Sequence, residues 1–138
     1  MPMRLSSTLR QLELPLARLA IFVVYFWFGL LKLIGVSPAG EMVHALFDVT
    51  IHIFPFATFY TLFALFEMLI GLLFLVKGME KIALCLIAVH LVLTVLPLII
   101  LPAMTWQGLF QPTLEGQYII KNILILSAAV TVGARRFY

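Results

Sequence analysis

Four polar side chains in the stretch EMVHALFDVTIH, residues 41–52, have types and spacing that could bind a ligand. Glu41, His44, Asp48 and His52 follow one another at intervals of three, four and four residues. At about 100° per residue, a helix places all four within an arc of about 80°. Imidazole and carboxylate groups on one such stripe could hold a metal ion, form a proton path or simply make the polar face of a helix.

A metal site on this stripe would need ligands from elsewhere in the chain, such as Glu115. His44 and His52 would lie about 12 Å apart along the helix axis, so they cannot bind the same ion, although either can share one with Asp48. The rest of the helix surface is apolar, which favours a polar face packed against protein or a groove through hydrogen bonds and charge pairs. We therefore predict no metal, and keep His44, Asp48 and His52 as candidate ligands.

Ionisable residues that interrupt long apolar stretches form a second group. Glu67 and His90 lie in the middle of two such stretches, whereas Lys32 and Lys121, the latter followed by Asn122, lie near the ends of two others. If the stretches are membrane helices, each charge costs roughly 2.5–3.5 kcal/mol, so these side chains should face the protein interior and pair. Equal depth predicts His90 as a partner of Glu67, and opposite side-chain tilt predicts Lys32.

Two arrangements of this second group remain open. In one, a polar cavity opens outward between the helices, aided by a kink at Pro97, and binds a small ligand. Its candidate lining residues are Lys32, Glu67, His90, Glu115, Lys121 and Asn122. In the other arrangement, the two lysines reach the outer headgroups and Glu67 is a paired structural residue.

The composition indicates which elements must position these residues. Hydrophobic residues make up 64% of the 138 residues and charged residues 11%, which is too little polar surface for a water-soluble globule. A membrane core about 30 Å thick needs about 20 apolar helical residues, and four stretches qualify. They run from about 14 to 34, 56 to 76, 82 to 101 and 118 to 134. We therefore predict one all-α membrane domain over residues 1–138, an integral four-helix bundle.

Basic residues predict how the helices cross the membrane. Most of them lie before or at the start of the first stretch, between the second and third, or after the fourth: Arg4, Arg10, Arg18, Lys77, Lys81, Arg135 and Arg136. Because lysine and arginine concentrate on the cytoplasmic side, both termini should be cytoplasmic. A cleavable signal peptide is the alternative for the N-terminus, and the length of the first apolar run disfavours it.

The polar stripe lies between the first two apolar stretches. Ser37 and Pro38 are typical of a helix start, and Pro55 should end the helix, so we predict a helix over about 38–54. A fifth membrane crossing here would put the basic C-terminus outside, against the charge rule. The sequence therefore predicts a non-spanning helix on the external side.

Three motifs together resemble those of a known family. The stretches FWFGLLKLIG, FEMLIGLLFLVKG and EGQYIIKNILIL are similar to the DoxX-like family of small four-helix bacterial membrane proteins, especially its RclC/YkgB-like branch. The resemblance covers residues from about 19 to 132. It implies four spans with cytoplasmic termini in the bacterial inner membrane, and a link to redox or oxidative-stress processes. It also implies charged side chains at Lys32, Glu67, Glu115 and Lys121, although the external segments here are shorter than in that branch.

Three hypotheses about function follow. The first is an accessory membrane protein that binds a quinone or lipid, or docks on a membrane redox partner or a second copy of itself. The second is an oxidoreductase subunit that holds a quinone or haem, with His90 and a histidine of the external helix as haem ligands. The third is a small oligomeric transporter that uses Glu67. No catalytic residue, required cofactor or nucleic-acid partner is predicted, and one buried thiol, Cys85, disfavours dithiol chemistry.

Overall fold

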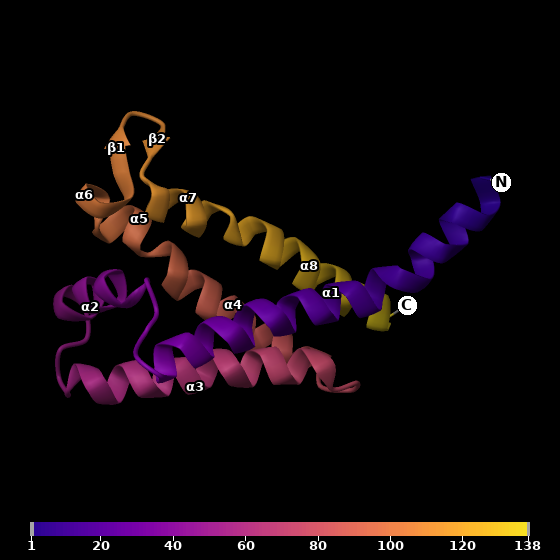
Figure 1. Cartoon of the computed structure of the whole chain (residues 1–138), viewed down its shortest axis with the longest axis horizontal. Coiled ribbons are helices and arrows are strands. Elements are labelled where there is room, and N and C mark those ends of the chain that lie inside the picture. The colour runs from indigo at the N-terminus through magenta and orange to yellow at the C-terminus, as the bar shows by residue number, and fades with distance from the viewer. Residues whose placement is uncertain (1, 138) are drawn as a thin grey trace.

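The computed structural model describes residues 2–137 and is mostly helical, as Figure 1 shows. Met1 and Tyr138 lie outside the described residues. The long helices are α1 (Pro2–Leu33), α3 (Phe56–Leu75), α4 (Glu80–Val95) and α8 (Asn122–Phe137). With the short helices that continue α4 and precede α8, they give four segments long and apolar enough to cross a membrane. The prediction of four membrane-spanning candidates is therefore confirmed.

The four long helices contact one another in a closed ring. α1 contacts α3 and α8, and α4 contacts the same two helices. Buried side chains fill the centre of this ring: Ile21, Tyr25, Ile70, Phe74, Ala83, Ile87, Leu91, Ala129 and Val132. Many large apolar side chains on the outside are exposed, and so is Cys85, which was expected to be buried. An apolar outer surface of this extent fits a hydrocarbon environment rather than water.

Two glycines let α1 and α3 approach closely. A Cβ atom added at Gly71 would lie 3.0 Å from the Phe26 nitrogen and 3.2 Å from the Phe22 carbonyl oxygen. A Cβ atom added at Gly29 would lie 2.8 Å from the Ala64 carbonyl oxygen. Small residues at such contacts allow membrane helices to pack backbone against backbone. This contact holds α1 and α3 in the register on which the polar site described below depends.

Helix α1 is longer than predicted. It begins at Pro2 rather than near residue 14, and its 32 residues make a helix of about 48 Å. That length exceeds a membrane core of about 30 Å, and the N-terminal turns extend beyond the other helices (Figure 1). Hydropathy alone does not predict these turns, because their polar residues fall outside the apolar stretch.

Proline interrupts the third membrane-spanning candidate, at the position where the cavity arrangement expected a kink. α4 ends at Val95, and Pro97 begins the four-residue helix α5 (Pro97–Ile100). Because proline has no amide hydrogen, it cannot continue the hydrogen-bond ladder of α4. A second short helix, α6 (Pro102–Thr105), also begins at a proline and leads out of the span.

A small β-hairpin, absent from the all-α prediction, joins the third and fourth spans. β1 (Trp106–Gly108) pairs antiparallel with β2 (Gln111–Pro112). Strands this short leave too little alternation in the sequence to be detected. The fourth span then begins with α7 (Leu114–Ile120), earlier than the predicted residue 118. The Thr113 hydroxyl caps α7 by accepting a hydrogen bond from the Gly116 amide at 3.2 Å.

Between α1 and α3 lies a short helix, α2 (Gly40–Val49), where a helix over 38–54 was predicted. The predicted boundaries are therefore wrong at both ends. Thr50 is β-branched, which disfavours a helical interior, and its hydroxyl donates to the Leu46 carbonyl at 2.5 Å. The chain then runs irregularly to α3, so His52 is no longer part of the helical stripe.

The two ends of the molecule differ in charge. The N-terminus, the turn between α3 and α4 and the C-terminus lie at one end, and α2 and the hairpin lie at the other (Figure 1). The lysine and arginine positions of both termini and of the turn between α3 and α4 therefore lie at the same end, as the charge rule predicted. Residues 33–76 and 82–120, which include α2 and the hairpin at the second end, contain no lysine or arginine, and Lys32 and Lys121 lie immediately outside these ranges.

Candidate functional site

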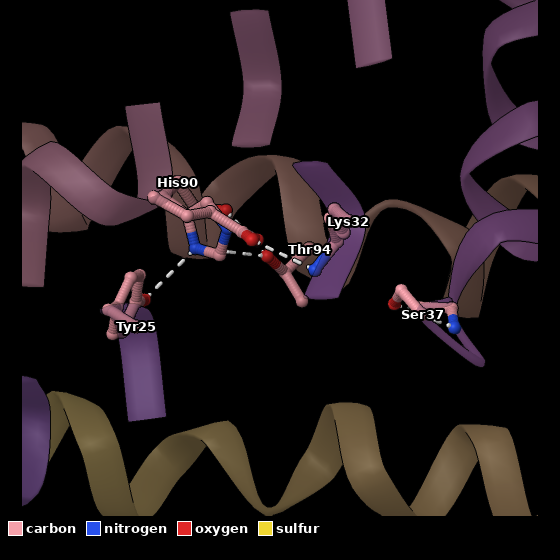
Figure 2. A network of polar contacts seen from close by, with 7 residues as sticks. Tyr25, Lys32, Ser37, His90 and Thr94 are labelled. Atoms are coloured by element: carbon pink, nitrogen blue, oxygen red, sulfur yellow. Dashed lines mark hydrogen bonds and ion pairs between the residues drawn. The ribbon is translucent and has the colours of Figure 1, made fainter. Parts of the chain in front are cut away.

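Three of the six candidate polar residues meet inside the helix ring. Lys32 from α1, Glu67 from α3 and His90 from α4 are all buried, and Tyr25 from α1 joins them. Figure 2 shows Tyr25, Lys32 and His90 of this group. We call Tyr25, Lys32, Glu67 and His90 the core network. At 1.5 Å per residue, Glu67 lies about 16 Å from the start of α3 and about 12 Å from its end. Glu67 therefore lies near the middle of α3, and Lys32 reaches it from the last turn of α1.

Glu67 is the centre of the core network. Its Oε2 accepts a hydrogen bond from the Lys32 ammonium at 2.8 Å, and its Oε1 lies 2.7 Å from His90 Nε2. The other ring nitrogen of His90, Nδ1, lies 2.9 Å from the Tyr25 hydroxyl. The Thr94 hydroxyl donates to the His90 carbonyl oxygen at 2.7 Å and lies 3.3 Å from Nδ1. The predicted pairing of Glu67 with Lys32 and His90 is confirmed.

These hydrogen bonds are compatible with a charge state that has no net charge. An ionised carboxylate can only accept, so Nε2 of His90 carries the hydrogen that it donates to Glu67. In a neutral ring Nδ1 is then an acceptor, and it receives the hydrogen of the Tyr25 hydroxyl. Lys32 is positive and Glu67 is negative. A neutral set is favoured here, because an unbalanced charge inside a membrane protein is strongly penalised.

Aromatic rings surround His90 and Lys32. The Phe63 ring stacks on His90 with a centroid separation of 5.3 Å, and the Lys32 ammonium lies 5.9 Å from the centre of the same ring. Phe66 lies 6.2 Å from the His90 ring, and Tyr25 meets that ring edge-on at 4.9 Å. The Phe63 face therefore stabilises both the imidazole, by stacking, and the ammonium, by a cation–π contact.

The other three candidates do not join the core network. Lys121 is exposed, and its ammonium lies 5.2 Å from the centre of the Tyr118 ring. Glu115 is also exposed and Asn122 is half-buried. Within the described residues, no hydrogen bond or ion pair links any of these three to Glu67 or its partners. Lys121 thus follows the second arrangement considered above, with its charge at the surface.

The polar stripe of α2 is more exposed than predicted. The side chains of His44 and Asp48 are 54% and 62% exposed and approach to 3.7 Å. Glu41 and His52 are exposed as well, whereas the apolar Phe47 packs against Phe59 of α3 and the His44 ring stacks on Phe56 at a centroid separation of 4.0 Å. The prediction that the whole stripe faces protein or a groove is therefore wrong, although the His44–Asp48 pair forms. Among the described residues, no group of three or more His, Cys, Asp or Glu side chains could hold a metal ion.

Tyr25 was not among the predicted site residues. It lies seven residues before Lys32, and Arg18 lies seven residues before Tyr25. Residues seven apart are separated by about two helical turns, so these three side chains follow one face of α1. All three are buried. This seven-residue spacing could have identified Tyr25 from the sequence, whereas the estimated membrane depths of the charged residues could not.

A second buried ion pair lies at the basic end of the helix ring. Arg18 Nη2 donates to Glu80 Oε1 at 2.5 Å, and Arg18 Nη1 donates to the Phe74 carbonyl at 2.9 Å. The other carboxylate oxygen of Glu80 accepts the Gly78 amide at 2.9 Å. The pair thus ties α1 to the end of α3 and the start of α4. Arg18 was expected among the cytoplasmic charges, and its pairing with Glu80 was not predicted.

Comparisons with known proteins add no further constraint on the site. No family model, curated protein or solved structure matches this chain. The resemblance to the DoxX-like family therefore stays a hypothesis.

Proposed function

We propose that this protein binds a quinone at the core network, as an accessory component of a redox process in a bacterial inner membrane. In this proposal the four long helices cross the membrane as a bundle, both termini are cytoplasmic and α2 lies on the external side. The separation of the basic positions from the end that carries α2 and the hairpin supports this orientation. The DoxX-like resemblance supports the redox link.

The observation that carries the proposal is the state of the Lys32 ammonium. It is buried, with 7% of the residue exposed, and it makes one hydrogen bond within the described residues, to Glu67. An ammonium has three N–H donors. The donors that Glu67 does not use lie in a low-dielectric region, where a new acceptor gains more than it would in water. A ligand that offers an oxygen acceptor there is therefore favoured.

A quinone has the chemistry that fits these surroundings. Its carbonyl oxygens accept hydrogen bonds, its flat ring can stack on aromatic side chains, and its hydrocarbon tail is soluble in lipid. A purely structural role is a weaker explanation, because a buried ion pair is often no more stabilising than apolar side chains of similar volume. Ionisable residues kept at membrane depth are more often functional.

The haem hypothesis is less well supported by the same geometry. Both ring nitrogens of His90 lie within hydrogen-bond distance of a partner, Nε2 of Glu67 and Nδ1 of Tyr25. An iron ion would have to displace one of these partners. The second histidine would come from α2, where His44 is exposed and paired with Asp48.

Thermal unfolding of the purified protein in detergent tests the quinone proposal. A short-tailed benzoquinone should stabilise the protein, by about 2.7 kcal/mol at 100 times its Kd. A dialkoxybenzene with the same tail, which lacks the carbonyl oxygens, should stabilise it much less. Lys32→Met should abolish the difference in stabilisation between the two compounds, and the matched control Lys121→Met should retain this difference.

Three results would contradict the proposal. Equal stabilisation by both compounds would mean that the carbonyl oxygens are not recognised. Loss of the difference in both lysine variants would mean that the effect does not arise at the core network. Stabilisation by a phospholipid and not by the benzoquinone would identify a lipid as the ligand instead.

A further inference from the structure

The turn between β1 and β2 presents two large apolar side chains to the surroundings. Leu109 and Phe110 form the two-residue loop of the hairpin, since Gly108 pairs with Gln111. They are 85% and 89% exposed, among the highest values of any large apolar residues in the described chain. Elsewhere, exposed apolar residues lie mainly along the outer faces of the long helices, where lipid would cover them. This tip lies beyond those faces, at the end that also carries α2 (Figure 1).

The backbone at this tip is strained at Phe110. Phe110 has φ of 55°, and among the described residues it is the only one besides glycines with a positive φ. The left-handed conformation costs a residue with a Cβ atom roughly 1–2 kcal/mol, and turns that need it usually contain Gly or Asn. Strain of this kind is often found at functional positions. A bulky aromatic residue at a strained and exposed position therefore indicates a binding role.

The segment around the tip carries no charge. From Leu91 to Leu114 the chain contains no Asp, Glu, Lys, Arg or His, whereas the opposite turn, residues 76–81, contains two lysines and a glutamate. Trp106 at the base of the hairpin donates its indole N–H to the Leu98 carbonyl at 2.9 Å. Tryptophan is enriched at the boundary between membrane and water. An uncharged hairpin anchored by tryptophan has the composition of a segment in that boundary.

The direction of the hairpin points to the same partner. It projects sideways from the helices rather than continuing along their long axis (Figure 1). It follows α6 directly and is separated from α7 by Thr113 alone, so it stays close to the level where the spans end. If the helices cross a membrane, the tip extends along the membrane surface.

We infer that Leu109 and Phe110 insert into the lipid interface of the external leaflet and act as a lateral membrane anchor. A lipid partner fits the size of the tip better than a protein does. A Phe side chain buries about 150–250 Å², and a stable protein interface buries about 1,000 Å² or more. The inference rests on the membrane orientation proposed above, and not on the quinone.

Site-specific fluorescence in nanodiscs tests the anchor. An NBD label is attached to a single cysteine at position 109 or 110, introduced as Leu109→Cys or Phe110→Cys in a Cys85→Ser background. Asp48→Cys in the same background is the control for a water-exposed site of the same end. The native Cys85, exposed on α4, is the reference for the membrane interior. The emission of each label is then measured with two quenchers, iodide in the water and nitroxide-bearing lipids in the membrane.

Labels at 109 and 110 should emit at shorter wavelengths than the label at 48, lose emission to shallow nitroxide lipids and resist iodide. Quenching by iodide equal to that at 48 would overturn the anchor. Protection in native membranes that is absent from pure lipid nanodiscs would also overturn it, and would identify a protein partner. Iodide quenching at Cys85 would mean that the outer face of α4 lies in water and not in the membrane, and would overturn the anchor with it.

A second variant separates insertion from the folding of the hairpin. Leu109→Ser with Phe110→Gly supplies a glycine where φ is positive and removes both apolar side chains. The hairpin should persist, as shown by unchanged Trp106 emission in detergent. A label on Gln107→Cys should then become more accessible to iodide than in the unmodified tip. Equal accessibility in both tips would overturn the inference.

Discussion

Removing either partner of the Lys32–Glu67 pair should destabilise the protein, and removing both should cost less than the sum. Glu67→Ala takes away the acceptor of the Lys32 ammonium at 2.8 Å and the partner of His90 at 2.7 Å. It leaves a buried ammonium without a counter-charge. Breaking a buried pair in this way costs about 3–5 kcal/mol. Glu67→Gln should cost less, about 2 kcal/mol, because its amide oxygen can still accept one hydrogen bond.

The double-mutant cycle measures the coupling directly. Lys32→Met alone should cost about 3 kcal/mol, since it leaves the Glu67 carboxylate with only the neutral His90 as a partner. Lys32→Met combined with Glu67→Gln removes both charges, so the combined loss should fall short of the sum by about 2 kcal/mol. The free energy of unfolding is measured in mixed micelles with increasing denaturing detergent. Lys121→Met and Glu115→Gln are controls that change the same residue types at exposed positions.

Two outcomes of this cycle would refute the reasoning. Strictly additive losses would mean that Lys32 and Glu67 do not interact. Losses from Lys121→Met or Glu115→Gln as large as those from the core variants would mean that any change of charge destabilises the protein. A combined variant that regains stability while both controls remain neutral would support the pair and its burial together.

Further predictions concern the helix contacts and the second ion pair. Glu80→Gln should lower the free energy of unfolding by about 3 kcal/mol, because the buried Arg18 guanidinium would lose its counter-charge and keep only its bond to the Phe74 carbonyl; a loss below 1 kcal/mol in the same detergent assay would contradict this. Gly71→Val should destabilise more than Gly71→Ala, which overpacks the α1–α3 contact by about 1–3 kcal/mol, and equal effects would argue against close backbone packing. Tyr25→Phe should cost about 1 kcal/mol through the hydrogen bond to His90, and an unchanged unfolding transition would mean that this bond contributes nothing.

The sequence predicts the spans and the central pairing because both follow from the membrane. Apolar stretches of about 20 residues must be helical where no water can satisfy the backbone. Charged residues inside such helices must find partners at equal depth. Those two constraints led to Lys32, Glu67 and His90, which the structure brings together.

Features outside the apolar stretches were predicted less well. The N-terminal turns of α1, the end of α2 and the hairpin are not constrained by hydropathy, so local interactions decide them. The Thr50 hydroxyl bond to Leu46 and the short β1–β2 pairing are examples. The pairing of Glu80 was missed for a different reason, because in the sequence Glu80 follows Gly78 in what resembles a charged surface turn. Only the folded chain brings it to Arg18, 62 residues earlier in the sequence.

The core network also limits how a ligand could bind. Glu67 accepts from two partners, and both ring nitrogens of His90 have a neighbour within hydrogen-bond distance, so neither side chain is free to bind a new group without losing a bond. Lys32 differs, because its ammonium has more donors than its one hydrogen bond to Glu67 uses within the described residues. A ligand acceptor can therefore be added at Lys32 while Glu67 keeps its counter-charge. On this argument Glu67 and His90 act mainly by holding Lys32 in place, so Glu67→Gln should weaken ligand binding less than Lys32→Met does.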